Sequence, residues 1–405
     1  MLTHQPEGGA QTGAMTAVLG GWGIRRWRWP GAAAVCAAAM VASCGVTGAH
    51  GGPARTPAAV GGARAGPVLG YRLNSVAALS AASAWATGLT NQVTLHVLRW
   101  DGRAWRPVPV RGGGDFYGVA ALSAADAWAV GYGPGGTQAL IEHWNGTAWR
   151  PVATPRAIGP AILHAVDAVS PGDVWAVGGT TNPTGHAVIL HWNGTAWTRV
   201  SSRPPPGVFS ELNGVAAVSA SNAWAVGDAN TKTQTIPLIE HWNGTAWRAV
   251  PSPALRFGGV LAGVAATSAT NAWAVGVRYG RATGGLIEHW NGTAWTLARS
   301  PALASGGLTG VTALSGTSAW AVGGTFPGSQ PPRTVIERWN GTFWALVPSP
   351  APGYLASVTA TSARNAWAVG VSAPTRNATG VIEHWDGNSW TCISATGTAG
   401  PCPAG

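Results

Sequence analysis

Cysteine is scarce in this chain. Only four occur among 405 residues, and none lies between Cys44 and Cys392. The remaining two, Cys36 and Cys402, lie near the ends of the chain. Cys392 and Cys402 lie close together in sequence, but two cysteines supply too few ligands for a zinc site. The sequence therefore predicts no metal centre, and we expect no cofactor.

Charged residues are also few. Lys and Arg total 24 against 14 Asp and Glu, which gives a net charge of +10, and Lys232 is the only lysine. The arginines are dispersed over the chain, whereas nucleic-acid-binding domains gather basic residues into a patch or stripe. Nucleic acid is therefore excluded as a partner. The charge suits anionic surface polymers or lipid head groups, or it reflects a compositional bias towards Arg.

Acidic residues are too sparse to show a pair of catalytic carboxylates. Asp115, Glu211 and Asp228 are the acids near the variable connections described below, and we assign them to different repeats. Glycoside hydrolysis needs two carboxyl groups flanking one bond. No catalytic residue is therefore predicted.

Tryptophan, by contrast, is abundant. Of 24 Trp residues, 21 fall into seven triplets. The first members are 43, 47, 49, 49, 47 and 47 residues apart, and they are Trp85, Trp128, Trp175, Trp224, Trp273, Trp320 and Trp367. A period of this length is typical of propellers and solenoids. The sequence therefore predicts seven structural repeats in which the tryptophans form the core.

Each repeat reads as four antiparallel strands, here called A to D. In the second repeat, strand A is the apolar run 117–122, strand B is 127–131, strand C is 140–144 and strand D is 147–152. Between strands C and D lies Asn145-Gly146, a strong hairpin signal because both residues tolerate the positive φ of a primed turn.

The spacings divide each repeat between two faces. The strand A valine precedes the strand B tryptophan by nine residues in every repeat, and the strand C and D tryptophans are always five apart. The distance between the strand B and C tryptophans varies from 15 to 19 residues. All length variation thus lies in the B–C and D–A connections, which form one face, the variable-loop face. The A–B and C–D turns form the opposite, tight-turn face. Insertions in repeat proteins tend to map to the binding face.

Seven such sheets around a channel form an all-β, seven-bladed β-propeller, which leaves only short sheet edges. A linear stack is the alternative, but it requires polar capping repeats, and the first and last repeats keep all three tryptophans. No N-terminal strand is available to complete the last blade. We therefore expect blade 1 to pack face to face against blade 7. The propeller is assigned to residues 67–395 and a C-terminal tail to 396–405.

The repeats resemble kelch repeats of the galactose-oxidase type. They share the order of apolar strand, turn, aromatic-x-Val-Gly, variable loop, acidic-x-aromatic, tight turn and Trp, and two repeats keep the double glycine, at Gly178-Gly179 and Gly323-Gly324. The resemblance covers residues 73–393 and implies the fold rather than a function, because propellers host unrelated activities. The copper-radical chemistry of that family requires a Cys-linked Tyr, and the cysteine is missing from the blades.

The N-terminal residues predict export. Arg25 and Arg26 precede an apolar stretch, 31–43, that is too short to span a membrane and is typical of a signal peptide. The following Cys44 completes a sequence that resembles a bacterial lipobox, which implies lipidation of Cys44 and anchoring to the outer face of the cytoplasmic membrane. An ordinary signal peptide or a signal anchor is the alternative. Residues 1–43 are assigned to the signal peptide and 44–66, rich in Gly, Ala and Pro, to a flexible tether.

The two C-terminal cysteines are expected to form a disulfide. Cys36 leaves with the signal peptide and Cys44 accepts the lipid, so Cys392 and Cys402 remain as a pair in an oxidising compartment. Their disulfide would hold the tail to strand D of the last blade.

Histidine recurs on strand C of five repeats, at His143, His191, His241, His289 and His384. Equivalent positions of different blades lie on a ring, so these side chains cannot converge on one metal ion. We expect each to partner a neighbouring carboxylate such as Glu142.

The other aromatic residues indicate a binding face. Eight of the ten Phe and Tyr lie in or beside the variable connections, and aromatic and Arg side chains are enriched at binding hot spots. Anchoring of the long loops is the alternative role. A second candidate is the ring of residues two positions before each strand A valine, at the channel mouth, which is either a small polar pocket or a solvated rim. The predicted ligand-binding residues are Phe116, Tyr117, Tyr132, His164, Asn213, Arg278, Tyr279 and Arg281.

These features favour a non-catalytic, monomeric exported protein that binds a protein or glycan of the cell envelope through its variable-loop face. It would contact the membrane only through its lipid anchor. The alternative is a propeller enzyme acting on glycans as a lyase, hydrolase or oxidase.

Overall fold

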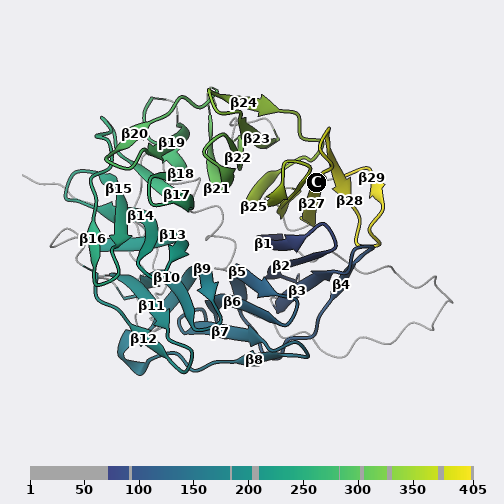
Figure 1. Ribbon diagram of the computed structural model, residues 1–405, viewed down its shortest axis with the longest axis horizontal. Helices are drawn as coiled ribbons and strands as arrows, with labels where there is room; N and C mark the ends of the chain where they lie inside the picture. Colours follow the sequence, from purple (N-terminus) through teal and green to yellow (C-terminus); the bar gives the residue numbers. More distant parts are fainter. Residues whose placement is uncertain are drawn as a thin grey trace, which may run out of the picture.

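The computed structural model describes residues 72–90, 94–182, 185–202, 209–281, 283–301, 305–325, 331–372 and 378–402. Seven antiparallel sheets surround a central channel (Figure 1), which confirms the predicted seven-bladed β-propeller. The predicted signal peptide, Cys44 and the tether lie outside the described residues. Among the residues described, no helix is long and apolar enough to cross a membrane.

Each blade takes its four main strands from one repeat, and they run from the channel to the outer edge (Figure 1). Blade 1 consists of β1 (Arg72–Ser80), β2 (Ser83–Leu89), β3 (Leu95–Trp100) and β4 (Trp105–Pro107). Blade 2 consists of β5 (Asp115–Ser123), β6 (Asp126–Tyr132), β7 (Ala139–Trp144) and β8 (Trp149–Pro151). The 3-10 turn η2 (Arg156–Ile158) leads into blade 3, which consists of β9 (Ala161–Ser170), β10 (Asp173–Thr180), β11 (Ala187–Trp192) and β12 (Trp197–Arg199). Blades 4 and 5 are formed by β13 (Phe209–Ser219), β14 (Asn222–Asn230), β15 (Thr235–Trp242), β16 (Trp247–Ala249); and β17 (Gly259–Ser268), β18 (Asn271–Arg278), β19 (Gly284–Trp290), β20 (Trp295–Leu297). Blades 6 and 7 are formed by β21 (Gly306–Ser315), β22 (Ser318–Thr325), β23 (Thr334–Trp339), β24 (Trp344–Val347); and β25 (Tyr354–Ser362), β26 (Asn365–Val371), β27 (Gly380–Trp385), β28 (Trp390–Ile393), with β29 (Ala399–Gly400) added at the edge.

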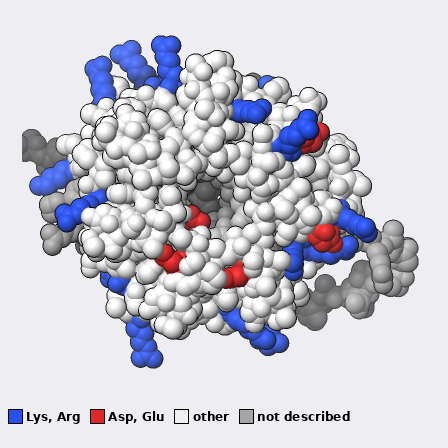
Figure 2. Space-filling view, in the orientation of Figure 1, with Lys and Arg blue, Asp and Glu red and all other residues white. Residues whose placement is uncertain are grey.

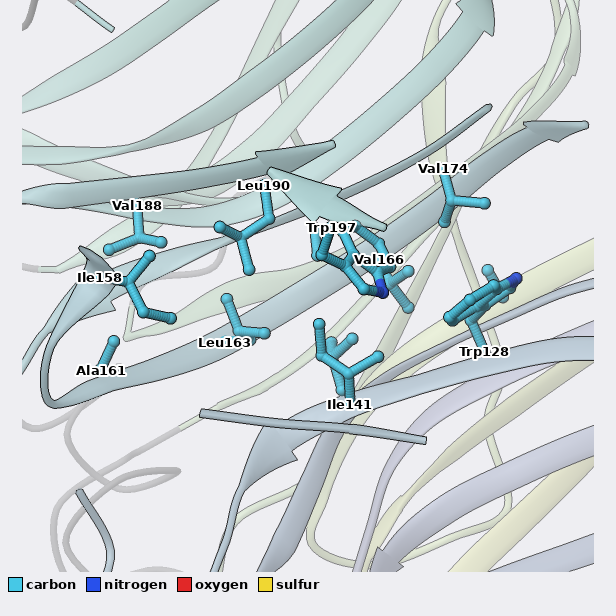
Figure 3. Packing of buried hydrophobic residues seen from close by; sticks show 13 residues of the cluster. Trp128, Ile141, Ile158, Ala161, Leu163, Val166, Val174, Val188, Leu190 and Trp197 are labelled. Atoms are coloured by element: carbon cyan, nitrogen blue, oxygen red, sulfur yellow. The ribbon is translucent and has the colours of Figure 1, made fainter. Parts of the chain in front are cut away.

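The core lies between neighbouring blades, as the tryptophan pattern predicts. Trp128 of blade 2 is 1% exposed, and its ring centroid lies 5.1 Å from that of Trp192 and 5.4 Å from that of Trp197, both in blade 3. Apolar side chains of both blades complete this cluster, among them Ile141 and Leu163 (Figure 3). The strand B tryptophan of each blade repeats this contact with the next blade, and edge-to-face aromatic pairs add to the energy of area burial.

Within the described residues, the ring closes by contacts between the faces of blades 1 and 7 rather than by strand exchange. Trp367 of blade 7 lies 5.0 Å from Trp100 and 5.2 Å from Trp105 of blade 1, measured between ring centroids. The Trp105 amide also donates a hydrogen bond of 3.1 Å to the Ala395 carbonyl just after β28. Blades 1 and 7 lie side by side in Figure 1, and this confirms the expected face-to-face closure.

The hairpin between strands C and D differs in detail from a two-residue Asn-Gly turn. In blade 2, Trp144 pairs with Trp149, and the Asn145 amide donates to the Ala148 carbonyl at 3.3 Å. Gly146, with φ of 92°, and Thr147 therefore form the tip. The Asn145 side chain accepts hydrogen bonds from the Thr147 and Ala148 amides at 3.1 and 3.0 Å, so it closes the turn from outside the tip.

The C-terminal tail is held to blade 7. β29 pairs with β28, with Gly400 opposite Cys392 and Ala399 opposite Ile393. Cys392 and Cys402 form a disulfide with a Cα–Cα distance of 5.2 Å. The tail therefore adds a fifth strand to the last blade.

Buried glutamates on strand C receive hydrogen bonds from the preceding blade. Three serine hydroxyls donate to glutamate Oε1 atoms at 2.7–2.8 Å, in the pairs Ser252 to Glu288, Ser300 to Glu337 and Ser349 to Glu383. Each serine lies five residues after the strand D tryptophan of its blade. Burial raises the pKa of each of the three carboxyl groups to about 7, although the serine hydrogen bond opposes this rise.

The contribution of these glutamates to stability is expected to fall as pH rises from about 4.5 to 7. The pKa of the Glu337 carboxyl group is 4.5 when it is fully solvated, as in the unfolded chain, and about 7 in the fold. Between these two values the unfolded chain releases a proton that the folded chain keeps. The stabilisation is fully present below the lower value. Urea unfolding between pH 4.5 and 8 should show a shallower loss of stability in Glu337→Gln than in the wild type. Ser300→Ala should instead steepen the loss, and equal slopes in all three proteins would contradict this assignment.

Candidate functional site

The channel mouth is lined by the predicted ring of residues. A cavity of about 150 Å³ lies on the axis, and its lining includes one ring residue from each blade: Asn74, Tyr117, His164, Asn213, Ala262, Thr309 and Ala356. Both expected forms, a small polar pocket and a solvated rim, are compatible with a cavity of this size. Blades 1 to 4 supply its bulky and amide side chains.

A β-bulge explains why these residues point into the channel. In the first half of the innermost strand of every blade, strand pairing skips one residue, as between Phe116 and Gly118 in blade 2 and between Leu212 and Gly214 in blade 4. The skipped residue is the ring residue, Tyr117 or Asn213 in these two blades. A bulge reverses the side-chain alternation at one point and re-aims a side chain. Each blade therefore presents one side chain to the axis while its neighbours remain in the core.

Tyr117, His164 and Glu211 form a connected row across blades 2 to 4. The Tyr117 and His164 rings stack with centroids 5.5 Å apart and an interplanar angle of 21°. His164 Nε2 lies 2.5 Å from Glu211 Oε1, and the two side chains are 8% and 19% exposed. Burial opposes ionisation of Glu211, but the adjacent His164 outweighs it, so the pKa of Glu211 lies below its usual value.

Glu211 directly faces a second carboxylate. It pairs across the strands with Asp228, which corrects the assignment of these acids to different repeats: both belong to blade 4. Burial, followed by repulsion from Glu211, raises the pKa of Asp228 to about 7. Asn213 donates to Asp228 Oδ1 at 3.4 Å and to the Leu261 carbonyl at 3.0 Å. The site thus holds one ionised carboxylate beside one that takes up a proton near neutral pH.

A buried ion pair borders this row. Arg72 of blade 1 contacts Asp115 of blade 2, and both side chains are almost fully buried. Asn74 donates to Asp115 Oδ1 at 3.0 Å and to the Phe116 carbonyl at 2.7 Å. The pair is neutral as a unit and joins the first two blades at the mouth of the channel.

The structure divides the predicted ligand-binding residues into three groups. Tyr117, His164 and Asn213 line the channel cavity. Phe116 is fully buried and Tyr132 is 7% exposed, so Phe116 belongs to the core between blades 1 and 2, while the Tyr132 ring supports Tyr117 from 5.6 Å. The last group, Arg278, Tyr279 and Arg281, lies on blade 5, where Arg278 lines a groove at the outer strands.

The pairing of Glu211 with Asp228 was not predicted, although the sequence holds its signal. Glu211 lies four residues before the strand A valine and Asp228 four residues after the strand B tryptophan. The constant nine-residue spacing places these two positions opposite each other in every blade, for example Asp115 opposite Tyr132. Only blade 4 has an acid at both positions.

The strand C histidines have partners within their own blades. In blades 2 and 3 the partner is a carboxylate, as predicted, although an aspartate rather than a glutamate such as Glu142; in blades 4, 5 and 7 it is an asparagine. His143 Nε2 lies 2.9 Å from Asp126 Oδ1, and His241 Nε2 lies 2.8 Å from Asn222 Oδ1, in each case at the start of strand B of the same blade. Glu142 projects from the opposite side of the strand because side chains alternate. Among the described residues, no group of three or more His, Cys, Asp or Glu is placed to hold a metal ion.

Charge is distributed unevenly over the disc. Figure 2 shows Lys and Arg side chains mainly around the outer edge, while some acidic side chains lie nearer the central opening. The protein is therefore basic at its perimeter, although its inner strands carry carboxylates such as Glu211, Asp228 and Asp167.

These features define a seven-bladed β-propeller with a polar channel mouth, and comparison with known proteins supports the fold. No protein-family model and no curated protein matches the sequence. Among solved structures, the chain is similar to YCF48 bound to D1 peptide, with a TM-score of 0.52 and 15% identity over 76% of this chain and 92% of that one. YCF48 from Cyanidioschyzon merolae matches with a TM-score of 0.53 and 16% identity over 79% and 96% of the two chains.

A glycan-active enzyme is also similar in fold. The GH74 xyloglucanase from Xanthomonas campestris matches with a TM-score of 0.53 and 13% identity, over 81% of this chain and 53% of the enzyme. This chain thus corresponds to about half of the xyloglucanase. At these identities the likeness concerns the propeller fold, which binding proteins and enzymes share.

Proposed function

We propose that this protein is a non-catalytic propeller that binds a protein or glycan of the cell envelope at its channel mouth, on the variable-loop face. The row Tyr117–His164–Glu211 carries this proposal, because the stacked rings of Tyr117 and His164 line the cavity and the carboxylate of Glu211 holds His164 from behind. Concave sites with a few fixed polar groups are the usual form of ligand sites. The neighbour that binds D1 peptide shows that a propeller of this size can take a polypeptide.

The cell-envelope location is part of the proposal. It rests on the predicted signal peptide and on Cys44 as the lipid acceptor. The kelch-like repeat type and the monomeric state likewise stay predictions.

Loss of the channel-mouth side chains is expected to weaken binding without unfolding the propeller. Tyr117→Ala and His164→Ala should each cost about 2 kcal/mol if they are hot-spot residues, or roughly a 30-fold rise in Kd. A glycan array and a pull-down from envelope extracts would identify the ligand, and calorimetry would then measure its affinity. Ala125→Ser and Thr147→Ser, on the tight-turn face, are the matched controls. Weakened binding in these controls with unchanged binding in the channel variants would contradict the proposal.

A second function is favoured by the Glu211–Asp228 pair. Two carboxyl groups whose pKa values are displaced in opposite directions suit an acid and a base acting on a glycosidic bond. The discriminating measurement is release of reducing ends from glycans. Turnover that disappears in both Glu211→Gln and Asp228→Asn, with glycan binding retained, would replace the binding proposal by an enzyme.

A further inference from the structure

A second concave surface lies far from the channel cavity, on the outer strands of blade 5. This outer groove has a volume of about 760 Å³ and shares no lining residue with the channel cavity. Its lining includes Leu297 and Arg299 at the outermost strand of blade 5, Arg278 from β18, and Phe343 from the C–D turn of blade 6. The groove therefore spans two neighbouring blades.

The groove exposes two large apolar side chains. Leu297 is 54% exposed and Phe343 is 57% exposed. The position of Phe343, just before the strand D tryptophan, is alanine in five repeats and serine in the last: Ala104, Ala148, Ala196, Ala246, Ala294 and Ser389. Because alanine is compatible with the fold at this position, the fold does not require a large aromatic side chain here. Exposed apolar surface of this kind marks an interaction site when it lines a groove.

The sheet edge beside the groove is open. β20 is the last strand in the order β17-β18-β19-β20, and no other described strand pairs with its outer side. Blade 7 shows that such an edge can accept another strand, because β29 pairs with β28 through Cys392 and Ile393. Cys392 and Leu297 occupy the same position, two residues after the strand D tryptophan. Open edges are templates for strand addition.

The charge of the groove selects one kind of strand. Arg278 and Arg299 are exposed and line it, and none of its lining residues is acidic. Arg281, also exposed, follows Arg278 by three residues. Carboxylates on a ligand would therefore find complementary charge, whereas basic residues would be repelled.

We propose that the outer groove binds an extended polypeptide segment in which apolar and acidic side chains alternate, and that this segment adds to β20 as a fifth strand. Its apolar side chains pack on Leu297 and Phe343, while its carboxylates pair with Arg278 and Arg299. Main-chain hydrogen bonds to β20 supply the affinity, and the side chains set the preference. The binding is independent of any ligand at the channel mouth.

The test uses the full-length chain and a fluorescein-labelled peptide of alternating Leu, Phe and Glu residues. Fluorescence anisotropy should give saturable binding that weakens at least tenfold in the double variant Leu297→Ala, Phe343→Ala. Both substitutions install the residue found at the same position in another repeat, so folding is preserved. Leu346→Ala is the matched control, since Leu346 is 53% exposed but does not line the groove, and its Kd should stay within twofold of the wild type.

Two further peptides make the proposal falsifiable. A peptide with Lys in place of Glu should not bind, and one with N-methylated backbone amides facing the strand should bind at least tenfold more weakly. Equal affinity for the Lys peptide, or equal affinity in the double variant, would overturn the proposal. Dimerisation of the wild type in sedimentation experiments, lost in the double variant, would overturn it in favour of a second copy as the occupant.

Discussion

Trp224→Ala is expected to destabilise the propeller by about 3–5 kcal/mol, as for a buried aromatic residue cut back to alanine. Trp224 is fully buried, and its ring lies 5.0 Å from Trp290 and 5.2 Å from Trp295 of the next blade. The substitution leaves a cavity and removes two aromatic contacts that join blades 4 and 5. Neither neighbour can fill the space, because both are fixed by their own strands.

Equilibrium unfolding in urea, followed by circular dichroism, measures this loss. Phe343→Ala is the control, because its side chain is 57% exposed and its removal should change stability by no more than about 0.5 kcal/mol. A loss below about 1 kcal/mol for Trp224→Ala would show that the tryptophan contacts are not what holds the blades together.

Breaking the disulfide is expected to cost about 3 kcal/mol. The bond joins Cys392 and Cys402, which are 10 residues apart, and closing a loop of this size restricts the unfolded chain by roughly that amount. The same change frees β29 from β28 and loosens the segment whose Ala395 carbonyl binds the Trp105 amide of blade 1. The effect is therefore expected at the seam between the first and last blades.

Thermal or urea unfolding of wild type with and without dithiothreitol, beside Cys402→Ser, tests this expectation. Reductant should lower the stability of the wild type to that of Cys402→Ser and leave the variant unchanged. A wild type that is insensitive to complete reduction would contradict the stabilising role.

The fold could be predicted because the repeat specifies it seven times. The constant spacings fix the pairing of strands A with B and C with D, and each tryptophan position that recurs is a packing position. Trp128 illustrates this, since its burial against blade 3 follows from the pattern alone. One failure of detail, at the Asn145-Gly146 turn, arose because the asparagine acts through its side chain.

The candidate sites were harder to predict because they depend on where repeats differ. Phe116 and Tyr117 are adjacent aromatics, yet a bulge sends one into the core and the other to the channel. The two-residue alternation of side chains along a strand does not predict such a bulge. Glu211 and Asp228 follow from strand register, but the outer groove depends on how Phe343 of blade 6 lies against Leu297 of blade 5, which only the assembled ring shows.

The closure of the ring without strand exchange between the described first and last blades has a consequence for chain connectivity. Every described blade draws its four main strands from one continuous segment, so the covalent link between two blades is only a D–A connection. The first and last blades meet through the same tryptophan contacts as any other pair, without such a link. The order of blades is thus circular in space although it is linear in sequence. A circularly permuted chain, joined across the seam and opened at another D–A connection, would retain every contact between blades.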